Sequence, residues 1–384
     1  MRHIGETTAP VIPERAHGGA DAQNPITAVD SKAYTIPTDK PESDGTFEWS
    51  STTIVIAEVT AGGVTGIGYT YSSPATAVVI REHLARVVAG CDAMMISTAW
   101  DRMVHAVRNI GRPGIAAAAI SAVDNALWDL KSKLLELPLI TLLGAVRRDV
   151  AVYGSGGFTS YSVAELREQF SGWVAEGISR VKMKVGREPD ADVTRVREAR
   201  ATIGDQAELF VDANAAYDLE LAAARARDFA ESRVSWFEEP VSSDDLNGLR
   251  LLRARKPEGM EIAAGEYGYD LGYFQRMLDA ESVDVLQADA TRCCGISEFL
   301  RVGALCESRG IALSAHTAPA LHLHPACAIK SLRHVEYFHD HVRIERVFFD
   351  GVAAPRNGCL APDMTRPGLG LDLKRRDAER FRMM

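Results

Sequence analysis

Between residues 150 and 340 the sequence repeats one pattern: a short apolar run ends in an ionisable residue, and a helical stretch follows. Six successive runs end at positions 23 to 28 residues apart, namely Lys184, Asp212, Glu238, Glu266, Asp289 and His316. A step of this length holds one strand, one helix and their connections, and strands that alternate with helices pair in parallel. The repetition predicts an α/β fold, and the number of repeats favours a closed (β/α)-barrel.

The expected strands are short and evenly spread. They cover 151–155, 180–185, 208–214, 234–240, 261–266, 284–289 and 311–316, with a weaker eighth at 334–338. Helical patterns lie between them, for example at 219–232 and 295–309. An open doubly wound sheet is the alternative arrangement, and it is disfavoured because no G-x-G-x-x-G motif follows the first strand.

The part of the chain before the predicted barrel differs in composition and in its pattern of apolar residues. Residues 1–25 are rich in Gly, Ala, Pro and charge, which is typical of a loose tail. Residues 52–71 alternate in polarity around Gly62 and Gly63, which predicts a β-hairpin. Helical patterns then follow at 75–89, 97–110 and 113–135. Strands followed by helices indicate a separate α+β unit.

Composition excludes several classes of protein. The chain has 384 residues, of which 46% are hydrophobic and 25% charged, so a large buried core is possible. A net charge of −9 and the lack of a Lys/Arg run argue against a nucleic-acid partner. No apolar window reaches the roughly 18 residues that cross a bilayer, and no signal-peptide core is evident, so no membrane partner is expected. Six sparse cysteines without a C-x-x-C pair predict a reduced, cytoplasmic protein.

The ionisable residues are informative because all C-terminal strand ends of a parallel barrel surround one opening. Asp212, Glu238 and Glu266 end three successive runs, so their carboxylates are expected side by side. A lone carboxylate after a strand is usually a helix N-cap or a solvated group. Three buried together repel one another and need a cation. Hard oxygen ligands without Cys or clustered His predict Mg²⁺.

Two groups of candidate bases flank this expected metal site. Lys182 and Lys184 form a K-x-K pair, and alternate residues of a strand point to the same side. Two close ammonium groups are expected to lower each other's pKa, so that one becomes a general base. Asp289 and His316 end the next two runs, and a carboxylate on one imidazole nitrogen would make the other nitrogen a second acid or base.

Other polar residues nearby have a plainer interpretation. His322 and His324 lie six and eight residues after His316 and could be metal ligands. Helix packing is favoured for both, because the carboxylates already account for a metal. Trp128 and Asp129 are likewise interpreted as helix packing residues.

Several short motifs follow one another in a fixed order. They are K-x-K at 182–184, V-D-A-N at 211–214, F-E-E-P at 237–240, A-G-E at 264–266, and then Asp289 and His316. In this order and spacing they resemble the mandelate racemase subgroup of the enolase superfamily. The segments ALWDLKSK at 126–133, PLITLLG at 138–144 and PGLGLDL at 367–373 extend the resemblance over most of the chain. It implies a (β/α)7β barrel with an α+β capping domain and Mg²⁺ as cofactor. The expected parts are the tail at 1–25, the capping domain at 26–145, the barrel at 146–340 and a segment at 341–384 that returns to the capping domain.

The resemblance also implies roles for particular residues. Asp212, Glu238 and Glu266 would be the metal ligands. Lys184 would be one base, with Lys182 tuning it or contacting the substrate, and His316 with Asp289 would be the other. Glu336, on the weak eighth strand, would be a carboxylic acid that hydrogen-bonds the substrate carboxylate, and Asn214 would contribute to substrate binding. Loops at 36–45 and 72–75 would close over the site.

The implied chemistry is removal of the proton alpha to a carboxylate, with an enediolate as intermediate. A β-hydroxyl can then leave as water, which converts a sugar acid to a 2-keto-3-deoxy acid, and this outcome is preferred. A racemase or epimerase of a 2-hydroxy acid is the first alternative, and a non-catalytic carboxylate-binding relative is the second. A cycloisomerase is disfavoured, since such relatives usually carry a lysine in place of the His–Asp pair. The partner is a small carboxylate, and a homo-oligomer is expected.

Overall fold

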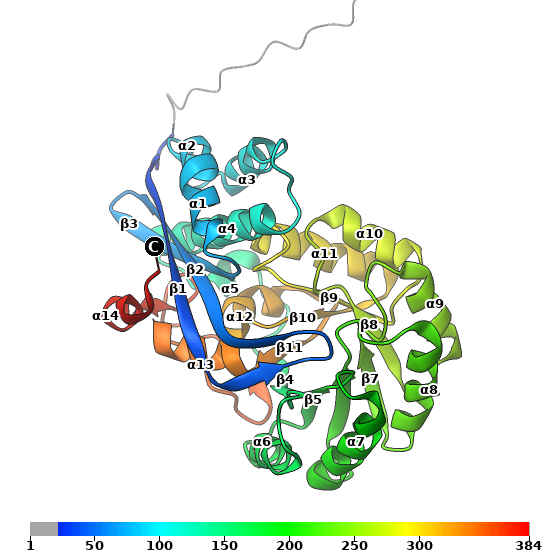
Figure 1. Cartoon of the computed structure of the whole chain (residues 1–384). Coiled ribbons are helices and arrows are strands. Elements are labelled where there is room, and N and C mark those ends of the chain that lie inside the picture. The colour runs from blue at the N-terminus through cyan, green and yellow to red at the C-terminus, as the bar shows by residue number, and fades with distance from the viewer. Residues whose placement is uncertain (1–21, 384) are drawn as a thin grey trace, which may run out of the picture.

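The computed structural model describes residues 22–383 as a barrel joined to a smaller capping domain (Figure 1). The tail expected at 1–25 therefore lies almost wholly outside the described residues. Within 22–383, eight parallel strands pair in sequence order, and the last pairs with the first to close the barrel. These strands are β4 (Val150–Gly156), β5 (Arg180–Lys184), β6 (Glu208–Asp212), β7 (Val234–Glu238), β8 (Glu261–Ala264), β9 (Val285–Ala288), β10 (Ala312–Ala315) and β11 (Leu332–Phe338).

Helices connect these strands on the outside of the barrel, which confirms the predicted (β/α)-barrel (Figure 1). They are α6 (Val163–Ala175), α7 (Pro189–Ile203), α8 (Leu219–Ala230), α9 (Leu246–Arg255), α10 (Leu271–Asp279), α11 (Ile296–Arg309) and α12 (Pro319–Ala328), with α13 (His339–Phe348) after the last strand. The weak eighth run is a full strand. Strands β8, β9 and β10 end before their ionisable residues, so Glu266, Asp289 and His316 follow their strands by one or two residues instead of ending them.

The inside of the barrel is packed and is not a pore. Tyr153, Phe210 and Trp236 stack there with Ala263 and Val285, and all five are buried. Lys182 lies above this cluster, with its Nζ 5.4 Å from the centre of the Tyr153 ring. The aromatic cluster therefore forms a dry floor under the polar residues at the strand ends.

The capping domain is built on an antiparallel sheet covered by helices (Figure 1). Its elements are β1 (Ile26–Ser43), β2 (Glu48–Ala61), β3 (Val64–Tyr71), α1 (Ala75–Val79), a π-helical turn (Ile80–Leu84), α2 (Ala85–Val88), α3 (Ile96–Ala106), α4 (Ile115–Leu134) and α5 (Leu139–Leu143). The predicted hairpin at 52–71 is confirmed as β2 and β3. Gly66 and Gly68 let α4 approach β3 closely, because a Cβ at either would lie 2.3 Å from a helix carbonyl oxygen.

The lid expected as a loop at 36–45 is mostly strand. β1 runs on to Ser43 and pairs with β2 almost to its end. The segment expected to form the lid is therefore the tip of a long hairpin. This hairpin lies across the barrel in Figure 1. Gly45 sits against the carbonyl oxygens of Val185 and Ala213, where a Cβ would be 2.7 and 2.4 Å from them. The hairpin tip therefore rests directly on the ends of β5 and β6. The second expected lid segment, 72–75, forms the turn into α1.

The C-terminal segment passes from the barrel back to the capping domain. It contains β12 (Phe349–Asp350), β13 (Cys359–Leu360), β14 (Asp372–Leu373), α14 (Arg375–Ala378) and a final 3-10 turn (Glu379–Phe381). Arg382 bridges to Tyr34 of β1, and Figure 1 shows α14 beside this strand. Asp129 of α4 accepts hydrogen bonds from the backbone N–H groups of Ile67 and Leu369. Interpreting Asp129 as a helix packing residue was thus incomplete, because it ties the sheet and the C-terminal segment together.

None of the helices within residues 22–383 is long and apolar enough to cross a membrane.

Candidate active site

Three buried carboxylates meet at the C-terminal end of the barrel. Asp212 and Glu238 are paired in register at the ends of β6 and β7, and Glu266 follows β8. Each offers one oxygen atom, and the three atoms lie within 4.8 Å of one another. Gly265 makes this approach feasible, since its φ is +131° and a Cβ there would lie 2.2 Å from the Gln287 carbonyl oxygen.

The three carboxylates fit a divalent cation. All are hard oxygen donors, and each residue is at most 3% exposed, so water cannot disperse their charge. Burial and the nearby Asp212 raise the pKa of Glu238 to about 8, although Lys182 opposes this shift. Crowding of this kind is what a bound Mg²⁺ would relieve.

Both lysines of the K-x-K motif point into this cluster. Lys182 Nζ lies 3.3 Å from Asp212 Oδ2 and 2.9 Å from Glu336 Oε1, and it also pairs with Glu238. Lys184 Nζ lies 2.5 Å from Asp212 Oδ2. Each lysine therefore contacts at least one predicted metal ligand.

The expected lowering of the lysine pKa is wrong for the protein without its cation. Burial favours the neutral amine of Lys184, but attraction to Asp212, Glu266 and Glu238 together outweighs burial and repulsion by Lys182, so the pKa of Lys184 is raised. The prediction from sequence considered the two ammonium groups and left out the carboxylates that separate them. A cation bound to the same carboxylates would oppose this shift.

His316 and Asp289 form a hydrogen-bonded pair next to Glu266. His316 Nδ1 lies 2.9 Å from Asp289 Oδ2, and its Nε2 lies 2.9 Å from Glu266 Oε2. Burial lowers the pKa of His316, but Glu266 and Asp289 outweigh burial and raise it to about 9. Lys184 thus contacts the predicted metal ligand Asp212, whereas His316 contacts the predicted metal ligand Glu266.

Glu336 lies on β11, which the sequence suggested only weakly. Its carboxylate accepts a hydrogen bond from the Thr317 N–H at 3.0 Å and pairs with Lys182. Burial raises the pKa of Glu336, but Lys182, His316 and Lys184 together outweigh this effect, and the pKa falls to about 2. Glu336 remains a predicted contact of the substrate carboxylate.

Asn214 lies at the edge of the site rather than within it. Its backbone N–H donates to Asp212 Oδ1 at 3.0 Å, and its side-chain Oδ1 has no hydrogen-bond partner among the described residues. It lines a pocket of about 530 Å³ together with Tyr267, Tyr273 and Ser243. This pocket opens beside the carboxylate cluster, so Asn214 remains a predicted substrate contact.

Two residues near the site were missed from the sequence. Arg292 lies 3.7 Å from both Glu266 Oε1 and Asp289 Oδ2, and it stacks over the Tyr267 ring. Glu239, the second glutamate of F-E-E-P, is fully buried, and neither of its carboxylate oxygens has a hydrogen-bond partner among residues 22–383. Its φ of +38° shows that the strand alternation has ended at this position. The second glutamate of the F-E-E-P motif could have indicated that Glu239 lies near the site. No local pattern indicates Arg292, since it follows the strand end by several residues.

The two downstream histidines are structural, as predicted. His322 Nε2 accepts a hydrogen bond from the Ala290 N–H, and its Nδ1 faces the Thr317 carbonyl oxygen. His324 Nδ1 accepts from the Ile140 N–H. These partners occupy both ring nitrogens of His322 and one of the two in His324.

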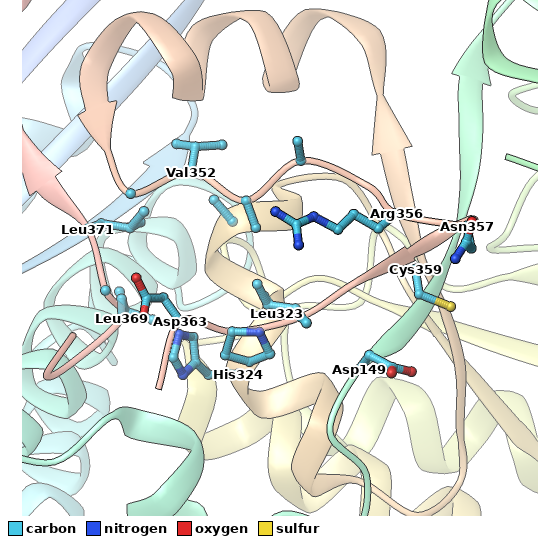
Figure 2. Close-up of a pocket in the computed structure, with 17 residues that line it drawn as sticks. Asp149, Leu323, His324, Val352, Arg356, Asn357, Cys359, Asp363, Leu369 and Leu371 are labelled. Carbon is cyan, nitrogen blue, oxygen red and sulfur yellow. The ribbon is translucent and has the colours of Figure 1, made fainter. Parts of the chain in front are cut away.

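A pocket of about 770 Å³ lies elsewhere, between α12 and the C-terminal segment (Figure 2). Leu323 and His324 line one side of it, and Asp363 and Leu369 line another. Its edge reaches Asp149, which directly precedes β4, so this edge is at the N-terminal end of a barrel strand. The strand-end residues do not line this pocket, and it is separate from the candidate active site.

A closed parallel barrel with a capping domain and a carboxylate trio at its strand ends defines an enzyme of the enolase superfamily. Residues 36–144 match the family described as mandelate racemase / muconate lactonizing enzyme, N-terminal domain, and residues 165–378 match the enolase C-terminal domain-like family. The chain therefore belongs to the mandelate racemase / muconate lactonizing enzyme family.

Characterised relatives cover nearly the whole chain. The 3,6-anhydro-α-L-galactonate cycloisomerase of Streptomyces coelicolor is 34% identical over 91% of this chain and 98% of its own length. The arabinonate dehydratase of Saccharolobus solfataricus is 31% identical over 84% of this chain and 88% of its own length.

Solved structures agree closely with the fold. A mandelate racemase/muconate lactonizing enzyme-like protein from Rubrobacter xylanophilus is 52% identical, with a TM-score of 0.92 over 94% of this chain and 100% of that protein. A racemase from Streptomyces coelicolor with bound magnesium is 32% identical, with a TM-score of 0.88 over 93% of this chain and 100% of that protein.

Proposed function

We propose that this protein removes the proton alpha to the carboxylate of a sugar acid and expels the β-hydroxyl as water, which leaves a 2-keto-3-deoxy acid. The observation that carries this proposal is the position of the two bases. Lys184 and the His316–Asp289 pair contact different members of one buried carboxylate trio. Relatives of the chain include dehydratases of this kind.

Asp212, Glu238 and Glu266 would hold Mg²⁺ in this proposal. When bound, Mg²⁺ would supply positive charge that stabilises the negative charge developing on the substrate carboxylate as it becomes an enediolate. Lys182, which already pairs with Glu336, would place a further positive charge there. The lid excludes water from the site, which strengthens each of these interactions.

The proton transfers would be divided between the two bases. The neutral amine of Lys184 would accept the α-proton, and the electron pair of the C–H bond would pass toward the carboxylate. The imidazolium of His316 would then donate its Nε2 proton to the departing hydroxyl, which leaves as water. Asp289 bonds Nδ1, so Nε2 is the nitrogen that faces the site. A substrate of opposite configuration would exchange the roles of the two bases.

A cycloisomerase is a second candidate, although the His–Asp pair argued against it. The cycloisomerase relative at 34% identity supports it. In a cyclic ether acid, the oxygen on the β-carbon belongs to the ring, so the same elimination opens the ring and loses no water. A racemase, as in the solved relative from Streptomyces coelicolor, would return the proton on the opposite face.

The test is a panel of sugar acids, cyclic ether acids and 2-hydroxy acids, incubated with the enzyme and Mg²⁺. Mass spectrometry and a carbonyl reagent separate the outcomes. Dehydration gives a carbonyl product lighter by one water, ring opening gives a carbonyl product of unchanged mass, and epimerisation gives neither change. The proposal expects the first outcome with at least one acyclic sugar acid. Tight ligand binding without turnover across the panel would indicate a non-catalytic relative instead. A homo-oligomer in the cytoplasm remains a prediction.

A further inference from the structure

A second cluster of potential cation ligands lies outside the candidate active site, where the lid meets the barrel. It consists of Asp39 and Glu42 near the end of β1 and His339 at the start of α13. Each residue offers one ligand atom, and the three atoms lie within 4.8 Å of one another. His339 follows β11 directly, so the cluster joins the capping hairpin to the strand that carries Glu336.

Glu42 is a buried carboxylate that uses only part of its hydrogen-bonding capacity. Its side chain is 0% exposed. One carboxylate oxygen accepts a hydrogen bond from Trp49 Nε1 at 2.8 Å, and the other has no hydrogen-bond partner among the described residues. Burial and the nearby Asp340 raise the pKa of Glu42 to about 9. A buried carboxylate oxygen without a partner is costly unless a proton or a cation neutralises it.

The basic side chains nearby form ion pairs with other groups, although Arg343 Nε has no hydrogen-bond partner among the described residues. Arg343 donates to Asp340 Oδ1 at 2.6 Å and to the Pro37 carbonyl oxygen at 2.8 Å. Lys40 pairs with Glu165 at 2.8 Å. Within residues 22–383, Glu42 therefore has no ion-pair partner. His339 Nε2 is hydrogen-bonded to Asp39 Oδ2 at 3.0 Å, and a cation bound by both groups would replace this contact.

We propose that Asp39, Glu42 and His339 bind a second divalent cation, which fastens the lid to the barrel. Two carboxylates and one imidazole favour a first-row transition cation such as Zn²⁺ or Mn²⁺ over Mg²⁺, which prefers oxygen ligands alone. Asp39 is partly exposed, so water can complete the coordination sphere. Such a cation would stabilise the closed lid without touching the reacting atoms.

The test is Zn²⁺ stoichiometry by calorimetry on the purified full chain. Wild type should bind two equivalents, one at the carboxylate trio and one at the lid. Glu42→Gln and His339→Ala should each bind one, as should Glu238→Gln, which removes the other site. His105→Ala, a change to an exposed histidine of α3, is the matched control and should bind two. Glu42→Gln keeps an acceptor for Trp49, so it should fold.

Location and stability give independent readouts. Zn²⁺ should raise the Tm of Glu238→Gln, and this rise should be lost when Glu42→Gln is added. Crystals soaked in Zn²⁺ should show an anomalous peak between the three side chains. Equal stoichiometry in wild type, Glu42→Gln and His339→Ala would overturn the proposal. So would a crystal structure with no peak there and the Arg343 guanidinium turned onto Glu42, because an internal ion pair would then replace the cation.

Discussion

His316 Nδ1 lies 2.9 Å from Asp289 Oδ2, beyond the ends of two neighbouring strands of the barrel. The carboxylate holds the imidazole in one tautomer and leaves Nε2 directed at Glu266 and the candidate metal site. We expect the two residues to act together, and each can be changed on its own to test this.

Asp289→Asn should preserve the shape of the site and weaken His316 as an acid or base. We expect kcat to fall about 10²- to 10⁴-fold, because the imidazolium loses its stabilising charge. Calorimetry should show Mg²⁺ affinity close to that of wild type, since Asp289 is not among the three clustered carboxylates. An unchanged kcat would show that the pair has no part in the rate-limiting chemistry.

Metal removal tests the carboxylate trio. EDTA should abolish activity and Mg²⁺ should restore it, because Asp212, Glu238 and Glu266 are the predicted Mg²⁺ ligands. Glu238→Gln should weaken Mg²⁺ binding at least about 10-fold, as loss of a charged ligand does. Glu239→Gln is the matched change at the neighbouring position and should weaken it less, since Glu239 is not among the three clustered carboxylates. Full activity in metal-free enzyme would contradict this assignment.

The seating of the lid depends on Gly45. Gly45→Ala would place a Cβ 2.4 Å from the Ala213 carbonyl oxygen, so the hairpin tip must lift. We expect kcat/KM to fall at least about 10-fold as water enters the site. Limited proteolysis near residues 37–45 should become faster, and ligand with Mg²⁺ should protect wild type better than the variant.

Gly172→Ala serves as the control for this change. It lies in α6 with no atom within 4 Å of the added Cβ, so it should be neutral or stabilise the protein by about 0.5–1 kcal/mol. Equal kinetics for Gly45→Ala and Gly172→Ala would mean that the lid does not need this close contact.

The pH dependence of stability should reveal Glu345. This residue of α13 accepts hydrogen bonds from Tyr69 and the Ala320 N–H, and burial raises its pKa from 4.5 to about 8. Between those values the folded protein holds a proton that the unfolded chain releases, so stability is lost as pH rises. The slope for one proton is about 1.4 kcal/mol per pH unit.

Glu345→Gln removes this titration while keeping hydrogen-bonding groups in place. The variant should gain stability relative to wild type between pH 5 and pH 8, measured as the difference in unfolding free energy. Glu82→Gln, at an exposed position, should follow the wild-type curve. Parallel curves for wild type and Glu345→Gln would show that Glu345 stays ionised in the folded protein.

The sequence predicted the barrel and its strand-end residues because both follow from chain order. A strand and helix repeated seven or eight times at a regular interval favour a closed barrel, and Asp212, Glu238 and Glu266 then meet at one face. Glu336 was harder to place, since its strand, LRHVEYF, contains two charged residues and a histidine, and its pairing with β4 is nonlocal.

Other features depend on side-chain neighbours that no local pattern reveals. The sign of the Lys184 pKa shift is set by the combined pull of Asp212, Glu266 and Glu238, and Asp212 contacts both lysines. The Asp39, Glu42 and His339 cluster joins residues 300 positions apart, and the lid that carries it is a strand where a loop was expected.

Exchange of the substrate α-proton with D₂O, followed by NMR for wild type, Lys184→Ala and His316→Asn, tests the two-base mechanism most directly. If Lys184 abstracts the proton, His316→Asn should lose turnover but keep stereospecific exchange, and Lys184→Ala should lose both. A substrate of opposite configuration should invert this pattern. Each loss should reach at least about 10²-fold, the usual contribution of acid–base assistance. Turnover of both variants at rates near wild type would contradict the account, because neither residue would then move the α-proton.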